Sequence, residues 1–518
     1  MSVAPSARRW PGRTLALLTV AVFLVLVARF WHPVYGFTSF LQLDSSNDNV
    51  KIAAFRERPV FVYRDTGGYD GLYYAQIAYH PSLTSPELAP AMDNLAYRAR
   101  RILPPLLAWT LAAGNPDWIV HVYSLLNVAA WLALAAILWH LLAVDSARGW
   151  VAWAGVLFSA GALSSVRLAL TDLVALAILA GALLAAERGR RGWALGSLAV
   201  AGLARESSLL TVAGLLERPW LSRRNLLRAV VAAAPFAAWL LYVNWRVSGT
   251  SNGLYNFTWP VAGYIGKWAG LVSGLRFESE RLAVWTTVLA TIGLTVQAAY
   301  FLFHRRPDDR WWRIGLGYTA LLLLLGAPVW EGYPGAATRV LLPLNLAFNV
   351  LAHRSRAALT WLLAGNLTVF AGLLALGHVS HDQREIAAVN EHGTACIARL
   401  GDGWYDVERG WRHDRAWSRP TSRVDLQTWS QRDQPVRLEF FLRSLVRRSI
   451  TIRDAHGVLW TGTVGPEKLP VAVSTQLVAG KGQLEFFTPE PAVAESSGPN
   501  GRQLAFALYD AHLVLPEP

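Results

Sequence analysis

The chain has 518 residues, of which 53% are hydrophobic and 16% are charged, and its formal net charge at pH 7 is +13. It is more apolar and less charged than an average soluble protein, which excludes an ordinary soluble domain. Nearly uncharged runs long enough to cross a bilayer recur between residues 15 and 376. We therefore interpret the chain as a polytopic, α-helical membrane protein.

The positive charge is a topology signal, and no nucleic-acid partner is expected. Arginine clusters occupy short gaps between apolar runs, and loops of that kind stay cytoplasmic under the positive-inside rule. The clusters are Arg8, Arg9 and Arg13; Arg188, Arg190 and Arg191; Arg223, Arg224 and Arg228; Arg305, Arg306 and Arg310; and Arg354 with Arg356. Cys396 is the sole cysteine, which excludes an intramolecular disulfide.

In chain order, the N-terminus is predicted to be cytoplasmic, and an uncleaved first span, about 13–31, leads outward to a long loop, 32–116. Spans near 117–143, 149–165 and 168–186 follow. The apolar run 192–216 has arginines on both sides and is interrupted by Arg205 and Glu206. A hairpin of two short helices, with this charged pair at its outer tip, satisfies both features.

The remaining spans are predicted near 227–245, 281–303, 311–329, 339–352 and 357–378. They give about eleven crossings, outer loops at 246–280 and 330–339, and a C-terminus outside the cytoplasm. Residues 1–380 thus form the membrane domain. In residues 381–518, segments such as "VRLEFFLRS" alternate apolar and polar residues and are separated by Gly, Pro and Asp, which predicts an extracytoplasmic β-sandwich.

Ionisable residues gather at one face of this topology. They are Asp65, Asp70, Arg98, Arg100 and Arg101 on the first outer loop, Arg167 and Asp172 on the fourth span, Arg205 and Glu206 on the hairpin, and Glu331 with Arg339 beside the last outer turn. Charges at a membrane edge are costly and mark candidate sites. Any single one can equally be a structural ion pair, but their convergence favours a functional site.

Arginines beside carboxylates suit the transfer of a sugar from a lipid-linked phosphate. A guanidinium pairs with phosphate through its planar fork and stays charged when partly desolvated. The phosphate is already a good leaving group, so the reaction mainly needs a carboxylate that removes a proton from the incoming hydroxyl.

Two stretches of the first outer loop resemble a known family. "GGYDGLYYAQIAYHP" and "DNLAYRARRILPPLLAWTLA" are similar to the loop signature of GT-C integral-membrane glycosyltransferases. The resemblance is greatest to a bacterial group linked to cell-surface glycopolymer formation, and more distant to the GPI mannosyltransferase family. It implies a polyprenyl-phosphate sugar donor and a catalytic acidic residue in this loop, which corresponds to Asp70.

Carried over by motif, the resemblance implies a role for each matching residue. Asp70 is the base, and Gly71 lets the chain turn tightly beside it. By motif, the donor phosphate is assigned to Arg98 and Arg101, and Tyr69, Tyr73 and Tyr74 are expected to line the sugar or acceptor site. From their place in the topology, Arg205 and Arg339 are further candidates for the donor phosphate, and Asp65, Asp172, Glu206 and Glu331 are acceptor or supporting candidates. Leu72 and His80 depart from the group, which puts sugar contacts in doubt at the first and argues against catalysis at the second.

Two further features stay open at this level. Asp44, Asp48 and Asp65 could supply oxygen ligands for a divalent cation, although the motif does not require a metal. The aromatic side chains of Trp404, Trp411 and Trp417 could stack on sugars, but packing in the core of the β-domain is favoured.

The sequence thus predicts an inverting glycosyltransferase of a bacterial cytoplasmic membrane, in contact with membrane lipids and acting on a surface glycan or lipid. A non-enzymatic alternative is a glycolipid transporter or polysaccharide-assembly subunit, for which charges near the bilayer midplane and repeat symmetry are expected. A polymerase or ligase of lipid-linked oligosaccharides shares the chemistry, but usually carries its large loop between late spans.

Overall fold

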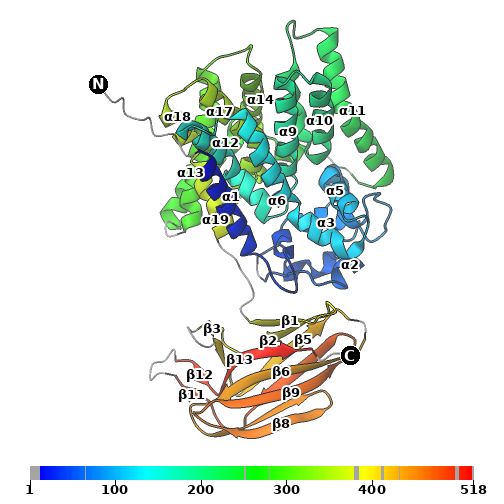
Figure 1. Cartoon of the computed structure of the whole chain (residues 1–518), viewed down its shortest axis with the longest axis vertical. Helices are drawn as coiled ribbons and strands as arrows, with labels where there is room; N and C mark the ends of the chain where they lie inside the picture. The colour runs from blue at the N-terminus through cyan, green and yellow to red at the C-terminus, as the bar shows by residue number, and fades with distance from the viewer. Residues whose placement is uncertain are drawn as a thin grey trace, which may run out of the picture. The chain divides into compact units, whose positions relative to one another are not determined.

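The chain divides into a helical unit and a β-sheet unit (Figure 1). The structure is a computed structural model that describes residues 12–64, 66–249, 253–278, 281–377, 384–409, 414–430, 432–495 and 501–515. The boundary follows Val379, except that two short segments, His32–Gly36 and Arg56–Val60, belong to the second unit.

Short elements fill the segment that was predicted as the first outer loop. The first helix is α1 (Gly12–Ala28). The short elements that follow it are η1 (Thr38–Leu41), η2 (Ser45–Val50), α2 (Ala53–Arg56), α3 (Gly71–Tyr79), α4 (Leu95–Ala99) and α5 (Leu103–Leu111). Asn94 caps α4, because its side chain accepts a hydrogen bond from the Tyr97 amide at 2.9 Å. Pro104 and Pro105 occupy the first turn of α5, where no amide donor is needed.

Four helices in the described part of the chain are long and apolar enough to cross a membrane. They are α6 (Pro116–Leu141), α11 (Arg223–Arg246), α13 (Leu282–Phe303), and the run Leu359–Gly377, made of α18 (Leu359–Gly365) and α19 (Thr368–Gly377). A fifth results if α7 (Ala147–Leu157) and α8 (Ala160–Arg167), bent by 42°, count as one span. These helices indicate a membrane-embedded protein.

The count of eleven spans remains a prediction. At several of the predicted span positions the helix is shorter than the length needed to cross a bilayer: α1 has 17 residues and α14 (Arg310–Leu324) has 15.

The remaining elements of the helical unit are α9 (Asp172–Glu187), α10 (Arg191–Ala204), η3 (Glu206–Leu215), η4 (Leu254–Asn256), α12 (Ala262–Phe277), α15 (Ala327–Trp330), α16 (Ala337–Val340) and α17 (Leu342–Arg354).

The predicted hairpin at 192–216 has its break at the expected residues. Helix α10 ends at Ala204, Arg205 is extended, and η3 begins at Glu206. Leu198 and Ala201 of α10 share a buried core with Val212 of η3, so the two arms pack on each other. The second arm is a 3-10 helix, and the predicted outer loop 246–280 contains a helix, α12, that was not predicted.

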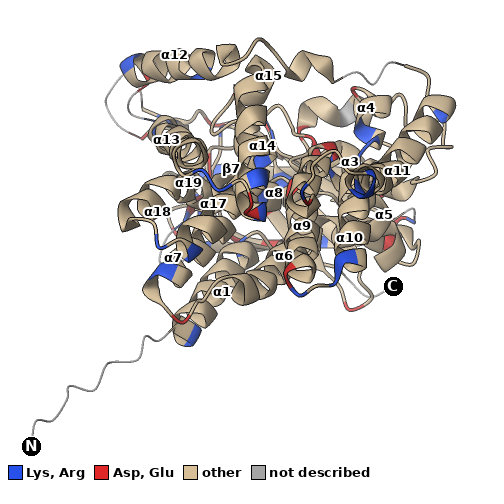
Figure 2. Ribbon diagram, turned by 90° about the horizontal axis from the view of Figure 1, so that it is seen from above, with Lys and Arg blue, Asp and Glu red and all other residues tan. Residues whose placement is uncertain are grey.

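Charged residues of the helical unit lie mainly at helix ends and in connecting segments, and most residues within the helices are uncharged (Figure 2). The apolar side chains are not all internal. On α11, Leu226, Leu227, Leu241 and Trp245 are exposed. An exposed apolar face of this kind is expected where a helix contacts lipid.

The second unit is an all-antiparallel β-sheet region. Its strands are β1 (Glu385–Val389), β2 (Ala395–Leu400), β3 (Glu408–Arg409), β4 (Asp414–Trp417), β5 (Thr421–Thr428), β6 (Gln434–Arg443), β7 (Arg448–Asp454), β8 (Gly457–Val464), β9 (Leu469–Leu477), β10 (Lys481–Phe487), β11 (Val493–Ala494), β12 (Gln503–Leu504) and β13 (Ala507–Val514). One sheet has the order β1-β2-β5-β10-β7-β8, a second has β3-β4-β13-β6-β9, and β11 pairs with β12.

The predicted alternation of apolar and polar residues is confirmed in these strands. Along β5 every second side chain is buried. Val424 of β5 and Leu438 of β6, from the two larger sheets, belong to one hydrophobic core. Trp404 and Trp417 are each 5% exposed, which confirms core packing for both, and Trp411 lies outside the described residues. The finer description of the region as a sandwich stays a prediction.

Candidate functional site

A cavity of about 840 Å³ lies at one end of helices α9, α10 and α14. Helix α9 begins there at Asp172, and Arg205 follows the last residue of α10. The polar side chains that line the cavity include Tyr69, Asp70, Tyr97, Arg98, Arg100, Arg101, Arg205, Glu206 and Arg339. Much of the remaining wall is apolar and includes Leu209, Leu210, Leu321, Leu325, Val329 and Val340. The cavity lining therefore combines charged and apolar side chains.

Asp70 is held at the edge of this cavity by the start of a helix. It is the residue before α3, and its side chain does not cap that helix. Its Oδ2 instead lies 2.8 Å from Nη1 of Arg98, and the side chain is 30% exposed. The carboxylate is thus oriented by one guanidinium while it remains accessible from the cavity.

Gly71 has a packing role that differs from the predicted one. A Cβ at this position would lie 2.4 Å from the carbonyl oxygen of Leu168 and 3.1 Å from that of Leu41. The left-handed backbone conformations of this stretch occur earlier, at Gly67 and Gly68. Gly71 is therefore needed for the close approach of α3 to neighbouring backbone, and the tight turn belongs to the two preceding glycines.

Arg98 joins Asp70 to a second carboxylate. Its Nε and Nη2 donate to Asp93 at 3.0 and 2.6 Å, and Tyr73 lies with its ring centroid 5.0 Å from the guanidinium carbon. Burial lowers the pKa of Arg98, but its hydrogen bonds to Asp93 and the charge of Asp70 outweigh burial and hold that pKa above its ordinary value. Arg98 is therefore a fixed positive charge between two carboxylates.

Arg101 forms a second ion pair across the cavity. Its Nε and Nη2 donate to the two carboxylate oxygens of Glu206 at 3.0 and 2.8 Å. Its Nη1 donates to the Tyr74 hydroxyl at 2.8 Å. Because bidentate pairs of this kind fix both partners, the first loop is attached to the tip of the α10–η3 hairpin.

Asp172 lies behind the cavity wall and binds two of the lining arginines. It is paired with Arg205 through Nη1, and its Oδ2 lies 3.6 Å from Nη1 of Arg339. Arg339 also donates to the Tyr69 hydroxyl at 2.7 Å. The Asp172 side chain is only 1% exposed, so the arrangement suits holding arginines in position rather than contacting a substrate.

Several predicted site residues do not line the cavity. Tyr74 is buried behind Arg101, and Tyr73 lies beside Arg98, so Tyr69 is the only one of the three predicted tyrosines among the lining residues. Leu72 is also buried, which removes the expected effect of this residue on sugar contacts.

Other predicted residues lie elsewhere. Glu331 lines a separate cavity of about 470 Å³ together with Lys267, and Arg167 donates to Ser39 and Tyr63. His80 is paired with Glu87 at 2.8 Å, in agreement with the argument against its being catalytic. Asp65 lies outside the described residues.

A divalent-cation site receives no support from the described residues, in which no three His, Cys, Asp or Glu side chains are grouped as metal ligands. The carboxylate of Asp44 accepts hydrogen bonds from Ser46 and Thr66, within its own loop. Of its two predicted partners, Asp48 has no described side chain and Asp65 is outside the described part.

Sequence reasoning missed three contributions to the site. Asp93 stands in the quoted motif, directly before the residue that caps α4, but an isolated loop carboxylate gives no pattern that distinguishes it. Tyr97 lines the cavity and accepts a hydrogen bond from Asn256 at 3.3 Å. Asn256 belongs to η4, in the predicted outer loop 246–280, whose aromatic and small residues gave no sign of this contact.

Comparisons of the chain with protein-family models, with curated proteins and with solved structures find no match. The resemblance to GT-C glycosyltransferases thus rests on short motifs of the sequence, and the function is inferred from these motifs together with the geometry of the cavity.

Proposed function

We propose that the protein is a GT-C type glycosyltransferase that transfers a sugar from a polyprenyl-phosphate donor to a cell-surface glycan or lipid. One observation carries the proposal: Asp70 and the arginines of the first loop and the hairpin line a single cavity that many apolar side chains also line. A lipid-linked phosphosugar requires this combination, because it brings an anion, a hydrocarbon chain and a reacting carbon into one site.

The charge around the cavity suits a donor with one negative charge. Five arginines line it: Arg98, Arg100, Arg101, Arg205 and Arg339. Two carboxylates, Asp70 and Glu206, also line it, and two more, Asp93 and Asp172, are paired with these arginines. Among these described residues, the guanidinium groups outnumber the carboxylates by one. A sugar joined to a polyprenyl chain through a single phosphate is a phosphodiester, whose one negative charge would neutralise that excess.

The apolar wall would accommodate the start of the polyprenyl chain. Leu209 and Leu210 come from η3, and Leu321 comes from α14. Leu210 is 42% exposed. An apolar path beside a ring of arginines allows the phosphate to be held at the charged side while the hydrocarbon avoids water.

In the proposed reaction Asp70 is the general base. The acceptor hydroxyl oxygen attacks the anomeric carbon while the bond from that carbon to the phosphate oxygen breaks. The phosphate leaves with the bonding electron pair, and the hydroxyl proton passes to Asp70. Arg98 engages Oδ2, and Oδ1 makes no hydrogen bond to any residue that the structure describes, so Oδ1 is the proposed proton acceptor. Direct displacement inverts the anomeric configuration.

We further propose that the cavity faces the outer side of a bacterial cytoplasmic membrane, with a cytoplasmic N-terminus and an extracytoplasmic C-terminal unit. The support is the arginine distribution of the sequence, because the residues between helices at the other end of α9 and α10 are rich in arginine.

The direct test measures sugar transfer by the purified full-length chain in lipid nanodiscs. A panel of polyprenyl-phosphate sugars would be supplied with acceptor lipids and glycans, and products identified by mass spectrometry. Asp70→Asn should lower the transfer rate about a hundred- to ten-thousand-fold, the range of general-base contributions, and leave donor affinity within about threefold. Glu87→Gln is the matched control, because Glu87 lies in the same loop, pairs with His80 and does not line the cavity.

Transfer by Asp70→Asn at the wild-type rate would contradict the assignment of the base. Donor binding and donor movement across the bilayer without any product, in the wild-type protein and with the whole acceptor panel, would favour the transporter hypothesis instead.

A further inference from the structure

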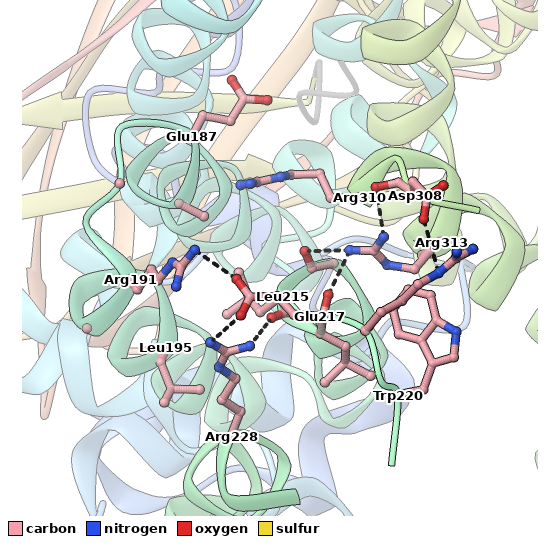
Figure 3. A pocket seen from close by; sticks show the side chains of 16 residues that line it. Glu187, Arg191, Leu195, Leu215, Glu217, Trp220, Arg228, Asp308, Arg310 and Arg313 are labelled. Carbon is pink, nitrogen blue, oxygen red and sulfur yellow. Dashed lines mark hydrogen bonds and ion pairs between the residues drawn. The ribbon is translucent and has the colours of Figure 1, made fainter. Parts of the chain in front are cut away.

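A second cavity, of about 560 Å³, lies at the opposite ends of the same helices. Figure 3 shows the side chains that line this cavity. It is located where α9 ends at Glu187, α10 begins at Arg191 and α14 begins at Arg310. The first cavity lies at the other ends of these helices. A helix of 16 residues, such as α9, is about 24 Å long at 1.5 Å per residue, so the two cavities are separate sites.

Five arginines line this second cavity: Arg191, Arg218, Arg228, Arg310 and Arg313. They come from three helices and the segment between η3 and α11, and they meet around one space rather than spreading over a surface. The positive-inside rule explains why basic residues are numerous in this region, but it does not require them to gather around one cavity.

The carboxylates at this site are already engaged by arginines. Glu217 is shared by Arg191 and Arg228, at 2.8 and 3.1 Å. Both oxygens of Glu187 accept hydrogen bonds from Arg354, a residue outside the cavity lining, and Oε1 also accepts one from Trp311 at 2.8 Å. Figure 3 shows Glu217 between its two arginines.

The third carboxylate, Asp308, pairs with Arg218 at 3.2 Å, and both side chains are largely exposed. A fourth carboxylate, Asp309, caps α14 at the same end and lies close enough for its charge to act on Arg313. With Arg354 included, six guanidinium groups therefore accompany four carboxylates among the described residues at this end of the helices. The first cavity has an excess of one positive charge, and the second has an excess of two.

Two arginines at this site, Arg310 and Arg313, form no direct ion pair with a carboxylate among the described residues, although the charge of Arg310 acts on Glu187 and those of Asp308 and Asp309 act on Arg313. Arg313 donates to main-chain carbonyl oxygens, including those of Ala213 at 2.8 Å and Leu216 at 3.0 Å, and lies over the ring of Trp220 at 5.0 Å. Nη1 of Arg310 is buried and makes no hydrogen bond to any residue that the structure describes. Because buried charged donors are nearly always satisfied, this nitrogen indicates a missing acceptor.

We propose that the second cavity binds a phosphomonoester or pyrophosphate group, with Arg310 as a direct ligand. A group of this kind carries two or more negative charges, which fits the excess of positive charge better than a phosphodiester does. All the cationic side chains that line the cavity are arginines, whose planar forks suit phosphate oxygens. The proposal is independent of the glycosyltransferase assignment, because it uses no residue of the first cavity.

The phosphate group can belong to a lipid headgroup or to a soluble molecule, and one experiment distinguishes the two. The full-length chain would be placed in nanodiscs of phosphatidylcholine, and its affinity for inorganic pyrophosphate measured by equilibrium binding. In parallel, nanodiscs containing phosphatidic acid, a phosphomonoester lipid, or phosphatidylglycerol, a phosphodiester lipid, would be compared by the thermal unfolding midpoint, since a ligand that binds the folded state raises this midpoint.

Arg310→Gln is the test variant, and Arg305→Gln is the matched control in the same connecting segment, exposed and outside the cavity lining. Arg310→Gln should weaken pyrophosphate binding, or reduce the lipid-induced shift, by about tenfold in affinity, and the control should not. Binding of pyrophosphate alone identifies a soluble ligand, and stabilisation by phosphatidic acid alone identifies a headgroup.

Equal stabilisation by phosphatidylglycerol and phosphatidic acid, with no effect of Arg310→Gln, would overturn the proposal in favour of nonspecific attraction to anionic lipid. The absence of both pyrophosphate binding and lipid stabilisation in the wild-type protein would overturn it as well.

Discussion

The two cavities at opposite ends of α9, α10 and α14 contain the same kinds of residues in different balance. Near Asp70, four carboxylates accompany five arginines, and three of the carboxylates remain partly accessible, at 30% for Asp70, 26% for Glu206 and 43% for Asp93. Near Arg310, Glu217 is shared by Arg191 and Arg228, Glu187 is paired with Arg354, and the excess of positive charge is larger.

This difference in the balance of carboxylates and arginines distinguishes a site that can only bind a phosphate from a site that can also catalyse sugar transfer. Arginines alone can hold a phosphate, but the transfer of a sugar also needs an acceptor for a proton. In each cavity one carboxylate has a single oxygen paired with an arginine, Asp70 with Arg98 and Asp308 with Arg218, but Asp70 is 30% exposed and Asp308 is 75% exposed. The more enclosed carboxylate belongs to the cavity with many apolar lining residues, which favours the first cavity as the candidate catalytic site and the second as a candidate binding site.

The largest predicted difference in unfolding free energy is between two variants that each lose one carboxylate, Asp172→Asn near the first cavity and Asp308→Asn at the second. Asp172→Asn leaves Arg205 and Arg339 without their buried partner, and loss of one member of a buried ion pair costs about 3–5 kcal/mol. Asp308→Asn breaks a pair whose side chains are 75% and 62% exposed, so its cost should be at most about 1 kcal/mol. Denaturant titration of the two variants measures both, and similar losses would show that the first ion-pair network is not tighter.

A smaller effect is predicted for adding one methyl group beside the first cavity, at Gly71, and one on α10, at Gly196. Gly71→Ala forces a Cβ against the carbonyl oxygens of Leu168 and Leu41, and such overpacking costs about 1–3 kcal/mol. Gly196→Ala on α10 meets nothing within 4 Å and should leave the unfolding free energy unchanged or raise it by up to about 1 kcal/mol. Thermal unfolding of the two variants tests the comparison, and a stable Gly71→Ala protein would contradict the close packing of α3.

The smallest effect concerns pH. Burial raises the pKa of Asp93, but the hydrogen bonds and charge of Arg98 outweigh burial and hold this pKa below its ordinary value of 3.8. A carboxyl group with a lowered folded pKa contributes stability that is present above the ordinary pKa and is lost as pH falls through the folded value. Asp93→Asn should therefore flatten the acid limb of the stability curve below about pH 4. A curve identical to that of the wild type would argue against the Arg98–Asp93 pair.

The candidate site was predictable from sequence to the extent that its residues belong to a motif or interrupt an apolar run. Asp70, Arg98 and Arg101 stand in the loop motif, and Arg205 with Glu206 breaks an otherwise apolar segment, so each carried a local signal. The pairing of these residues into separate ion pairs carried none, because it depends on side-chain positions across three segments of the chain.

In the sequence, the arginines of the second cavity indicated only which loops stay cytoplasmic. Arg191, Arg228 and Arg310 belong to clusters that orient membrane helices, and their number says nothing of whether they meet. Helix α12 was missed for a related reason, since its sequence "AGYIGKWAGLVSGLRF" contains four glycines, which weaken a helical pattern. Tertiary packing decides both features.

The central claim is that the two cavities differ in function, and a paired measurement of sugar transfer tests it most directly. The transfer rate from a polyprenyl-phosphate sugar would be measured for the full-length wild type, for Asp70→Asn and for Arg310→Gln in the same nanodiscs. We predict a loss of about a hundredfold or more for Asp70→Asn and a rate within about threefold of wild type for Arg310→Gln. A normal rate in Asp70→Asn together with a lost rate in Arg310→Gln would contradict the account.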